Sequence, residues 1–175
     1  MKKIILSLVL TVFAITADAQ LYLGGRLGVG ADISGRGNWV DFLQCSIQAE
    51  IGKKMNSKIA LGTTLGYEYL PYDGTHSFII SPYIRYTFVH WDMVSLFTDI
   101  GGSYAHLFGY QRGAYAVTIG LSPGVILNLS QHFSLIAHFG LLGCQWNNAD
   151  PSFTETSFGL QLNGSSLTFG AYYNF

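Results

Sequence analysis

At the end of the chain, residues Leu167 to Phe175 read LTFGAYYNF, and this stretch decides the fold. Apolar and small or polar residues alternate along it with a period of two, which is the pattern of a β-strand that buries one face in apolar surroundings. One face carries Leu167, Phe169, Ala171, Tyr173 and Phe175, and the other carries Thr168, Gly170, Tyr172 and Asn174. The stretch therefore predicts an all-β protein.

The start of the chain has the three zones of a secretory signal peptide. Lys2 and Lys3 precede an apolar run from Ile4 to Ile15, and Ala17-Asp18-Ala19 offers small residues at a cleavage site. The run is too short to span a bilayer as a helix. We therefore expect residues 1–19 to be a cleaved signal peptide and residues 20–175 to form one barrel domain.

Composition favours a membrane barrel over a soluble one. Charged residues make up 11% of the chain and aromatic residues 15%, whereas soluble domains carry about 25% charged residues. No stretch of the mature chain approaches the length of apolar sequence that a membrane-spanning helix requires. Only helices and closed barrels satisfy all backbone polar groups in lipid. No basic stripe indicates a nucleic-acid partner.

Period-two alternation recurs in eight segments. At about 3.3 Å per residue and a tilt near 40°, a ten-residue strand covers about 25 Å, the height of a barrel's apolar band. The less apolar face of these strands is rich in Gly, Ser and Thr, which suits the narrow interior of an eight-stranded barrel. The sequence thus predicts a closed, antiparallel, eight-stranded up-and-down transmembrane β-barrel with its apolar face outward. The expected strands are 21–32, 42–52, 59–70, 77–89, 94–105, 114–127, 133–143 and a final strand that ends at Phe175.

Three positions interrupt the pattern. Pro82 and Pro123 each remove a backbone donor from a predicted strand, so we expect a bulge or a local lapse in pairing at both. Asn163-Gly164 is a hairpin signal. A true turn there would add a ninth strand and place the termini on opposite sides of the membrane. Because transmembrane barrels have even strand numbers, we favour a bulge within one long final strand.

Aromatic residues gather near both ends of the predicted strands, as the two interfacial girdles of a membrane barrel should. One group consists of Tyr67, Tyr69, Tyr104 and Tyr115, and the other of Tyr86, Phe88, Phe133, Tyr173 and Phe175. The predicted outer loops are 34–40, 71–75, 106–113 and 144–155. The last is the longest, and we expect any surface contact to involve its residues Trp146, Asn147, Asn148 and Phe153.

The signal peptide, the strand number and the terminal Phe175 together resemble the small eight-stranded outer-membrane β-barrel family of the OmpA and OmpX type. The resemblance implies a monomer in the outer membrane of a Gram-negative cell envelope, surrounded by lipid, with both mature termini in the periplasm. It also implies periplasmic chaperones and a barrel-assembly machinery that reads the closing strand through Phe169, Tyr173 and Phe175.

Six ionisable residues are expected to point into the lumen. A lone charge in a narrow, dry interior costs several kcal/mol, so we expect these groups to pair. The preferred interpretation is a salt-bridge plug that closes the lumen, and a proton or ion path, as in a minor porin-like pore, is the alternative. The predicted cluster is Arg26, Glu50, Glu68, Arg85, Asp99 and His138.

An enzyme is a further alternative. Outer-membrane lipid A deacylases carry a sequence that resembles His-x-Ser at the position of His138. Here the run is His138-Phe139-Gly140, so the nucleophile is missing, although Ser152, Glu155 and Ser157 lie in the region of the last predicted outer loop. We expect no catalytic residue, cofactor or metal site. Cys45 and Cys144 are expected to remain free thiols, since about three strand spacings separate their strands around the wall. A structural or surface-interaction role is the leading functional hypothesis.

Overall fold

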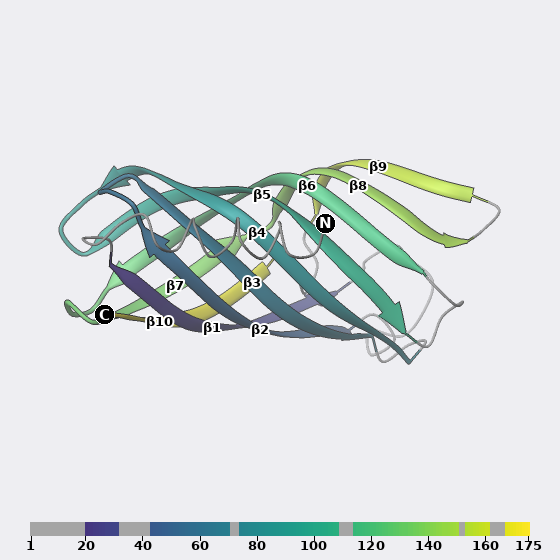
Figure 1. Ribbon diagram of the computed structural model, residues 1–175, viewed down its shortest axis with the longest axis horizontal. Coiled ribbons are helices and arrows are strands. Elements are labelled where there is room, and N and C mark those ends of the chain that lie inside the picture. Colours follow the sequence, from purple (N-terminus) through teal and green to yellow (C-terminus); the bar gives the residue numbers. More distant parts are fainter. Residues whose placement is uncertain (1–19, 32–42, 71–73, 109–113, 151–152, 162–166) are drawn as a thin grey trace, which may run out of the picture.

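The computed structural model describes residues 20–31, 43–70, 74–108, 114–150, 153–161 and 167–175. The predicted signal peptide, the predicted outer loop 34–40 and Asn163-Gly164 lie outside these residues. Every regular element in the described part is a β-strand (Figure 1). The strands are β1 (Leu21–Ala31), β2 (Leu43–Lys54), β3 (Ile59–Leu70), β4 (Thr75–His90), β5 (Val94–Phe108), β6 (Tyr115–Asn128), β7 (Phe133–Phe139), β8 (Leu141–Asp150), β9 (Phe153–Gln161) and β10 (Leu167–Asn174).

The ten labelled strands form an eight-stranded barrel wall. From β1 to β6 each strand pairs with the next, all antiparallel. The seventh wall position is shared by β7 and β8, which both pair with β6. The eighth is shared by β10, which pairs with β7, and β9, which pairs with β8. Pairing of β10 with β1 closes the ring, so the predicted closed eight-stranded barrel is confirmed.

The final wall position contains no hairpin. Because β7 and β8 both run antiparallel to β6, and β10 and β9 run antiparallel to them in turn, β9 and β10 point in the same direction. The two ends of the barrel chain also meet, since the Phe175 backbone N donates to the Leu21 backbone O at 2.9 Å. A ninth strand, which would have separated those ends, is therefore excluded.

Both prolines coincide with a lapse in pairing, as predicted. Pairing between β4 and β5 is interrupted between Ile80 and Tyr83, on either side of Pro82. Pro123 lies opposite the break between β7 and β8, where the register of β6 shifts by one residue. Gly140 occupies that break with a φ of 115°, and its carbonyl accepts a hydrogen bond from Ser122 Oγ at 2.8 Å. At each proline, strand pairing is therefore interrupted at the position where the missing backbone N–H would have been the donor.

The predicted outer loop 144–155 is wrong. The strand continues through β8 to Asp150 and returns as β9 from Phe153. Polar composition indicated a loop there, but a strand that has lost its apolar face can still pair through its backbone. Figure 1 shows β8 and β9 side by side at the end of the barrel away from the C terminus. We call this end the hairpin end, and the end with the turns 55–58, 91–93 and 129–132 the short-turn end.

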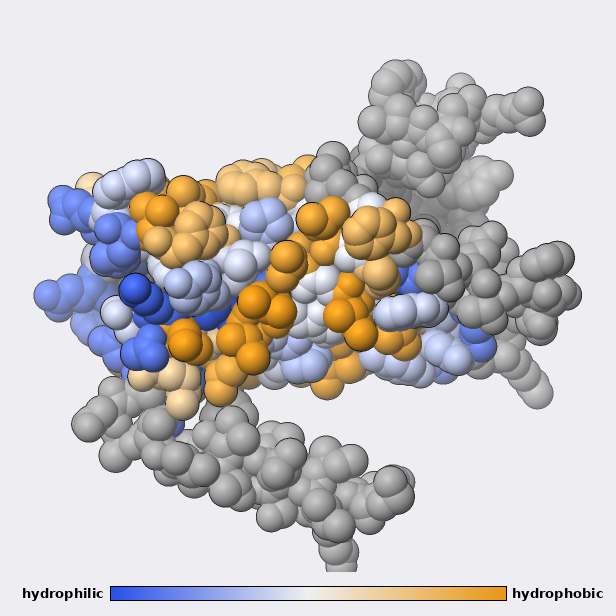
Figure 2. Space-filling view, turned by 90° about the horizontal axis from the view of Figure 1, so that it is seen from above, coloured by the Kyte–Doolittle hydropathy of each residue, from blue (hydrophilic) through white to orange (hydrophobic). Residues whose placement is uncertain are grey.

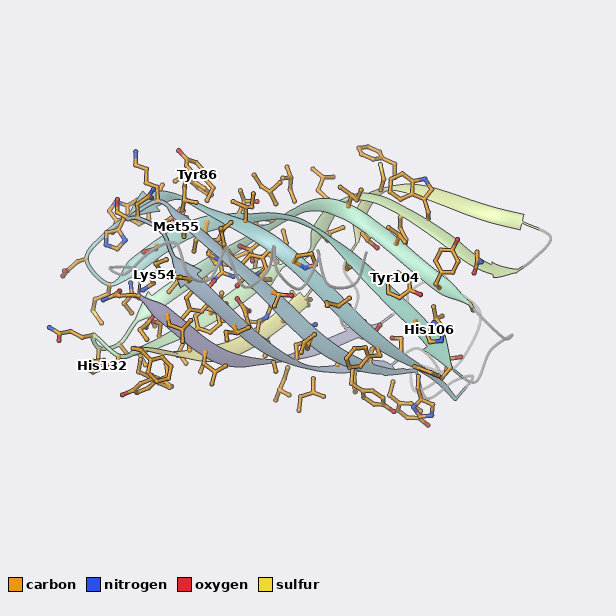
Figure 3. All side chains as sticks on the ribbon, in the orientation of Figure 1. Lys54, Met55, Tyr86, Tyr104, His106 and His132 are labelled. Carbon is orange, nitrogen blue, oxygen red and sulfur yellow. The ribbon has the colours of Figure 1, made fainter. Side chains whose placement is uncertain are left out.

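The exterior is apolar and the interior is polar. Leu27 and Ile47 expose 62% and 60% of their surface, whereas their strand neighbours Arg26 and Gln48 are buried. On the face that Figure 2 shows, hydrophobic side chains are spread over the middle of the barrel, and strongly hydrophilic ones gather at the short-turn end. Every residue of the two predicted aromatic girdles is exposed. Tyr86 lies near the short-turn end and Tyr104 toward the hairpin end, as those girdles require (Figure 3). No helix in the described residues is long and apolar enough to cross a membrane.

Inward glycines make room for inward aromatic rings. A Cβ atom added at Gly52 would overlap the Tyr22 ring, and one added at Gly62 would overlap the Tyr83 phenol. Both rings are buried in the lumen. Glycine is needed at these positions because the rings of neighbouring strands occupy the space that any side chain would fill.

Replacing Gly52 with alanine should therefore destabilise the barrel by about 1–3 kcal/mol, the usual cost of overpacking a filled core. Urea unfolding of protein reconstituted in lipid vesicles measures this loss. Gly25→Ala on the outward face of β1 is the matched control, because a Cβ there meets nothing nearer than a backbone oxygen at 3.6 Å. Equal loss in the two variants would show that the ring contact is unimportant.

Candidate functional site

All six ionisable residues predicted to face the lumen are buried there. Five of them form one hydrogen-bonded and ion-paired group, which we call the lumen network. Its charged or ionisable members are Arg26 of β1, Glu50 of β2, Arg85 of β4, Asp99 of β5 and His138 of β7. The five come together because period two directs them inward, and antiparallel register places Arg85 opposite Asp99.

Glu50 is the centre of the lumen network. Its Oε1 accepts hydrogen bonds from the Tyr172 hydroxyl at 2.7 Å, from Arg85 Nη2 at 3.1 Å and from the Tyr83 hydroxyl. Its Oε2 lies 2.9 Å from Arg26 Nε, in an ionic contact whose angle does not make a directed hydrogen bond. The carboxylate, 1% exposed, is thus contacted by both arginines.

Arg85 is held in a fixed plane. Its Nε and Nη2 donate to the two oxygens of Asp99, each at 2.7 Å, which is the bidentate geometry that a guanidinium and a carboxylate prefer. Nη1 donates to the Tyr172 hydroxyl at 3.0 Å. The guanidinium carbon also lies 4.3 Å from the centre of the Phe97 ring, within cation–π range. Arg85 thereby links four strands of the wall.

His138 joins the second arginine to the same carboxylate. Arg26 Nη1 lies 2.9 Å from His138 Nδ1, and His138 Nε2 lies 2.9 Å from Asp99 Oδ2. An arginine can only donate, so Nδ1 accepts and Nε2 carries the proton that it donates to Asp99. This assignment describes a neutral imidazole with a single ring proton. Arg26 Nη2 completes the arrangement by donating to Thr64 Oγ1 at 2.6 Å.

Charge in the lumen network balances. Two arginines face two carboxylates, and the neutral imidazole adds none. A buried charge is tolerated when it is paired and its remaining donors and acceptors are satisfied. The arrangement can therefore seal the interior by filling it with mutually neutralised groups.

Three tyrosines complete the lumen network, and none of them belongs to the predicted cluster. Tyr83 and Tyr172 donate to Glu50, and the Tyr22 hydroxyl lies 2.7 Å from that of Tyr83. All three fall on the inward parity of their strands, which is the signal that could have identified them. A search restricted to charged residues overlooks neutral donors.

Glu68 is the predicted member that lies apart. It follows Thr64 by four residues along β3, which displaces it by about 13 Å toward the hairpin end. There Ser77 Oγ donates to its Oε2 at 3.3 Å. Glu68 belongs to the lumen but not to the lumen network.

Nothing in the described geometry supplies a nucleophile beside His138. Both ring nitrogens face charged partners, and the hydroxyl recorded near them is Thr168 Oγ1, 3.4 Å from Nδ1. Glu155 and Ser157 lie on β9, and Ser152 lies outside the described residues. Within the described ranges no three His, Cys, Asp or Glu residues are placed to hold a metal ion. The absence of enzymatic activity stays a prediction.

The predicted surface-contact residues lie on the β8–β9 hairpin. Trp146 is 37% exposed, and Asn148 Oδ1 accepts a hydrogen bond from the Tyr115 backbone N at 3.1 Å. Asn147 pairs with Glu155 in the ladder, and Phe153 opens β9. The hairpin therefore presents these positions on paired strands instead of on a loop.

The outward face of β10 and the residue that follows this strand carry the three residues expected to guide assembly. Phe169, Tyr173 and Phe175 are all exposed, and the rings of the last two meet edge to face with centres 5.1 Å apart. Cys45 and Cys144 are both free, as expected. Their strands β2 and β8 are kept apart because β1 and the final wall position lie between them.

Comparison with solved structures identifies the architecture. The chain is similar to the N-terminal β-barrel domain of Pseudomonas aeruginosa OprF, with a TM-score of 0.59 and 12% identity over 90% of this chain and 98% of that one. It is also similar to Ail, the attachment invasion locus protein of Yersinia pestis, with a TM-score of 0.53 and 13% identity over the same shares. No protein-family model and no curated protein sequence matches. The chain thus has the fold of the small outer-membrane barrels of the OmpA and OmpX type.

Replacing Asp99 with asparagine should lower the free energy of unfolding by about 3–5 kcal/mol, because it removes the bidentate partner of Arg85 and leaves two buried arginines with Glu50 as their one carboxylate. Urea titration of the reconstituted barrel provides the measurement. Asp92→Asn is the control: Asp92 is exposed in the turn 91–93, so its loss should stay within about 0.5 kcal/mol. If both variants lost the same stability, the lumen network would not be the source of it.

Proposed function

We propose that this protein is a monomeric, integral outer-membrane barrel with a closed lumen, which acts structurally or as a surface-interaction module. The observation that carries the proposal is the lumen network itself. Its paired charges and tyrosines fill the interior of a barrel whose outside is apolar. Such an interior suits a wall that must be stable in lipid and impermeable.

The proposed orientation puts the short-turn end in the periplasm. Small outer-membrane barrels have short periplasmic turns and longer extracellular connections. The turns 55–58, 91–93 and 129–132 are of the short kind, and the two ends of the barrel chain meet at that same end. In this orientation the β8–β9 hairpin faces the outside of the cell.

A surface role would fall to the β8–β9 hairpin. Trp146 is partly exposed there, and exposed aromatic residues on a rigid scaffold are frequent anchors in protein contacts. The hairpin is held by eight residue pairs between β8 and β9, so its contact residues are presented in a defined arrangement. The closing strand β10 supports the proposed dependence on the barrel-assembly machinery, because its aromatic residues are exposed on the lipid face.

Planar-bilayer recording of the purified, folded barrel tests the closed lumen. We expect no resolved current steps, because two arginines, two carboxylates and three tyrosines contact one another in one layer across the lumen. Insertion is verified in the same preparation by protection of the strands from protease. Reproducible steps of uniform size from inserted protein would favour the pore alternative.

A further inference from the structure

The lumen opens at the short-turn end into a cavity of about 490 Å³. Arg85, Tyr22 and Tyr172 line it and also belong to the lumen network, which therefore forms its floor. Figure 3 places Lys54 at this end, away from Tyr104 and His106 at the hairpin end. The volume falls in the range of about 300–1,000 Å³ that is usual for small-molecule sites.

One side of the cavity is cationic. Lys54 ends β2 on the same inward parity as Glu50, and Lys58 follows in the turn 55–58. Arg85 is neutralised by Asp99 and Glu50, but neither lysine ammonium has a carboxylate partner among the described residues. No Asp or Glu lines the cavity. Uncompensated cations between low-dielectric walls concentrate a positive potential there.

The opposite side is polar and neutral. Asn174 of β10, Ser134 of β7 and Asn128 of β6 form a hydrogen-bonded chain across three neighbouring strands. Asn174 Nδ2 donates to Ser134 Oγ at 3.2 Å, and Ser134 Oγ donates to Asn128 Oδ1 at 2.9 Å. This chain leaves the Asn128 amide donors and the Asn174 amide oxygen outside it, available to a bound molecule. The cavity is thus polarised across its width.

We propose that this cavity binds a small anionic solute, whose carboxylate or phosphate group lies against Lys54 and Lys58. The neutral polar part of the solute contacts Asn128 and Asn174, and Tyr22 and Tyr172 form the floor beneath it. The site is separate from the β8–β9 hairpin and does not require an open lumen, so it stands independently of the surface role proposed above.

The test is a titration of the full folded barrel in a non-ionic detergent with inorganic phosphate, and separately with succinate, at constant ionic strength set by sodium chloride. Amide chemical shifts in two-dimensional NMR provide the readout. We expect saturable shifts in residues 54–60 and in the side-chain amides of Asn128 and Asn174 for at least one probe. Saturation by phosphate alone or by succinate alone identifies the preferred anionic group.

Lys54→Gln/Lys58→Gln should weaken binding by about tenfold or more, as expected when hydrogen bonds to charged groups are lost. Lys53→Gln is the matched control, because Lys53 points away from the lumen and does not line the cavity; it should change affinity by less than about twofold. Lys58→Gln alone changes an exposed side chain in the turn 55–58 and should show a partial loss. Shifts that never saturate with either probe would overturn the proposal. Shifts that persist unchanged in both Lys54→Gln/Lys58→Gln and Lys58→Gln would also overturn it.

Discussion

In a lipid bilayer every backbone N–H and C=O group must find its partner within the protein, and the rest of this structure depends on that constraint. Pairing runs from β1 through β6 to β7 and returns to β1 through β10, which closes the ring. Among the described residues, β9 pairs with β8 alone. Where proline or a strand break interrupts it, the interruption is local. At Gly140 a serine hydroxyl takes the place of the missing ladder contact.

Closure of the wall also decides what happens to the charges. With an apolar exterior, each inward-facing ionisable group must be satisfied inside a narrow lumen, and the lumen network does so by pairing two arginines with two carboxylates. Tyrosines and the neutral His138 supply the remaining contacts. The same layer that seals the barrel forms the floor of the cavity at the short-turn end. In the cavity itself the charges are not balanced, because Lys54 and Lys58 have no carboxylate partner among the described residues.

Period two made most of the fold predictable from sequence, since it fixes both the strand and the face on which each residue lies. Arg26, Glu50 and Asp99 were placed inward on that basis, and their burial confirms it. The part of the β8–β9 hairpin formed by residues 144–155 was missed because those residues lie where no apolar face is required, so composition carried no strand signal there. The sequence also did not predict the cavity, because residues of the turn 55–58 and neutral residues such as Asn128 line it, and these carry no distinctive pattern.

Electrophoretic mobility of the membrane-extracted protein, with and without boiling, tests the closed apolar-out barrel most directly. A closed barrel, whose strands pair around the whole ring, resists detergent at room temperature and unfolds only on heating. The account predicts two bands of different mobility, with the unheated form compact and found in the membrane fraction. A single heat-insensitive band in the soluble fraction would contradict it.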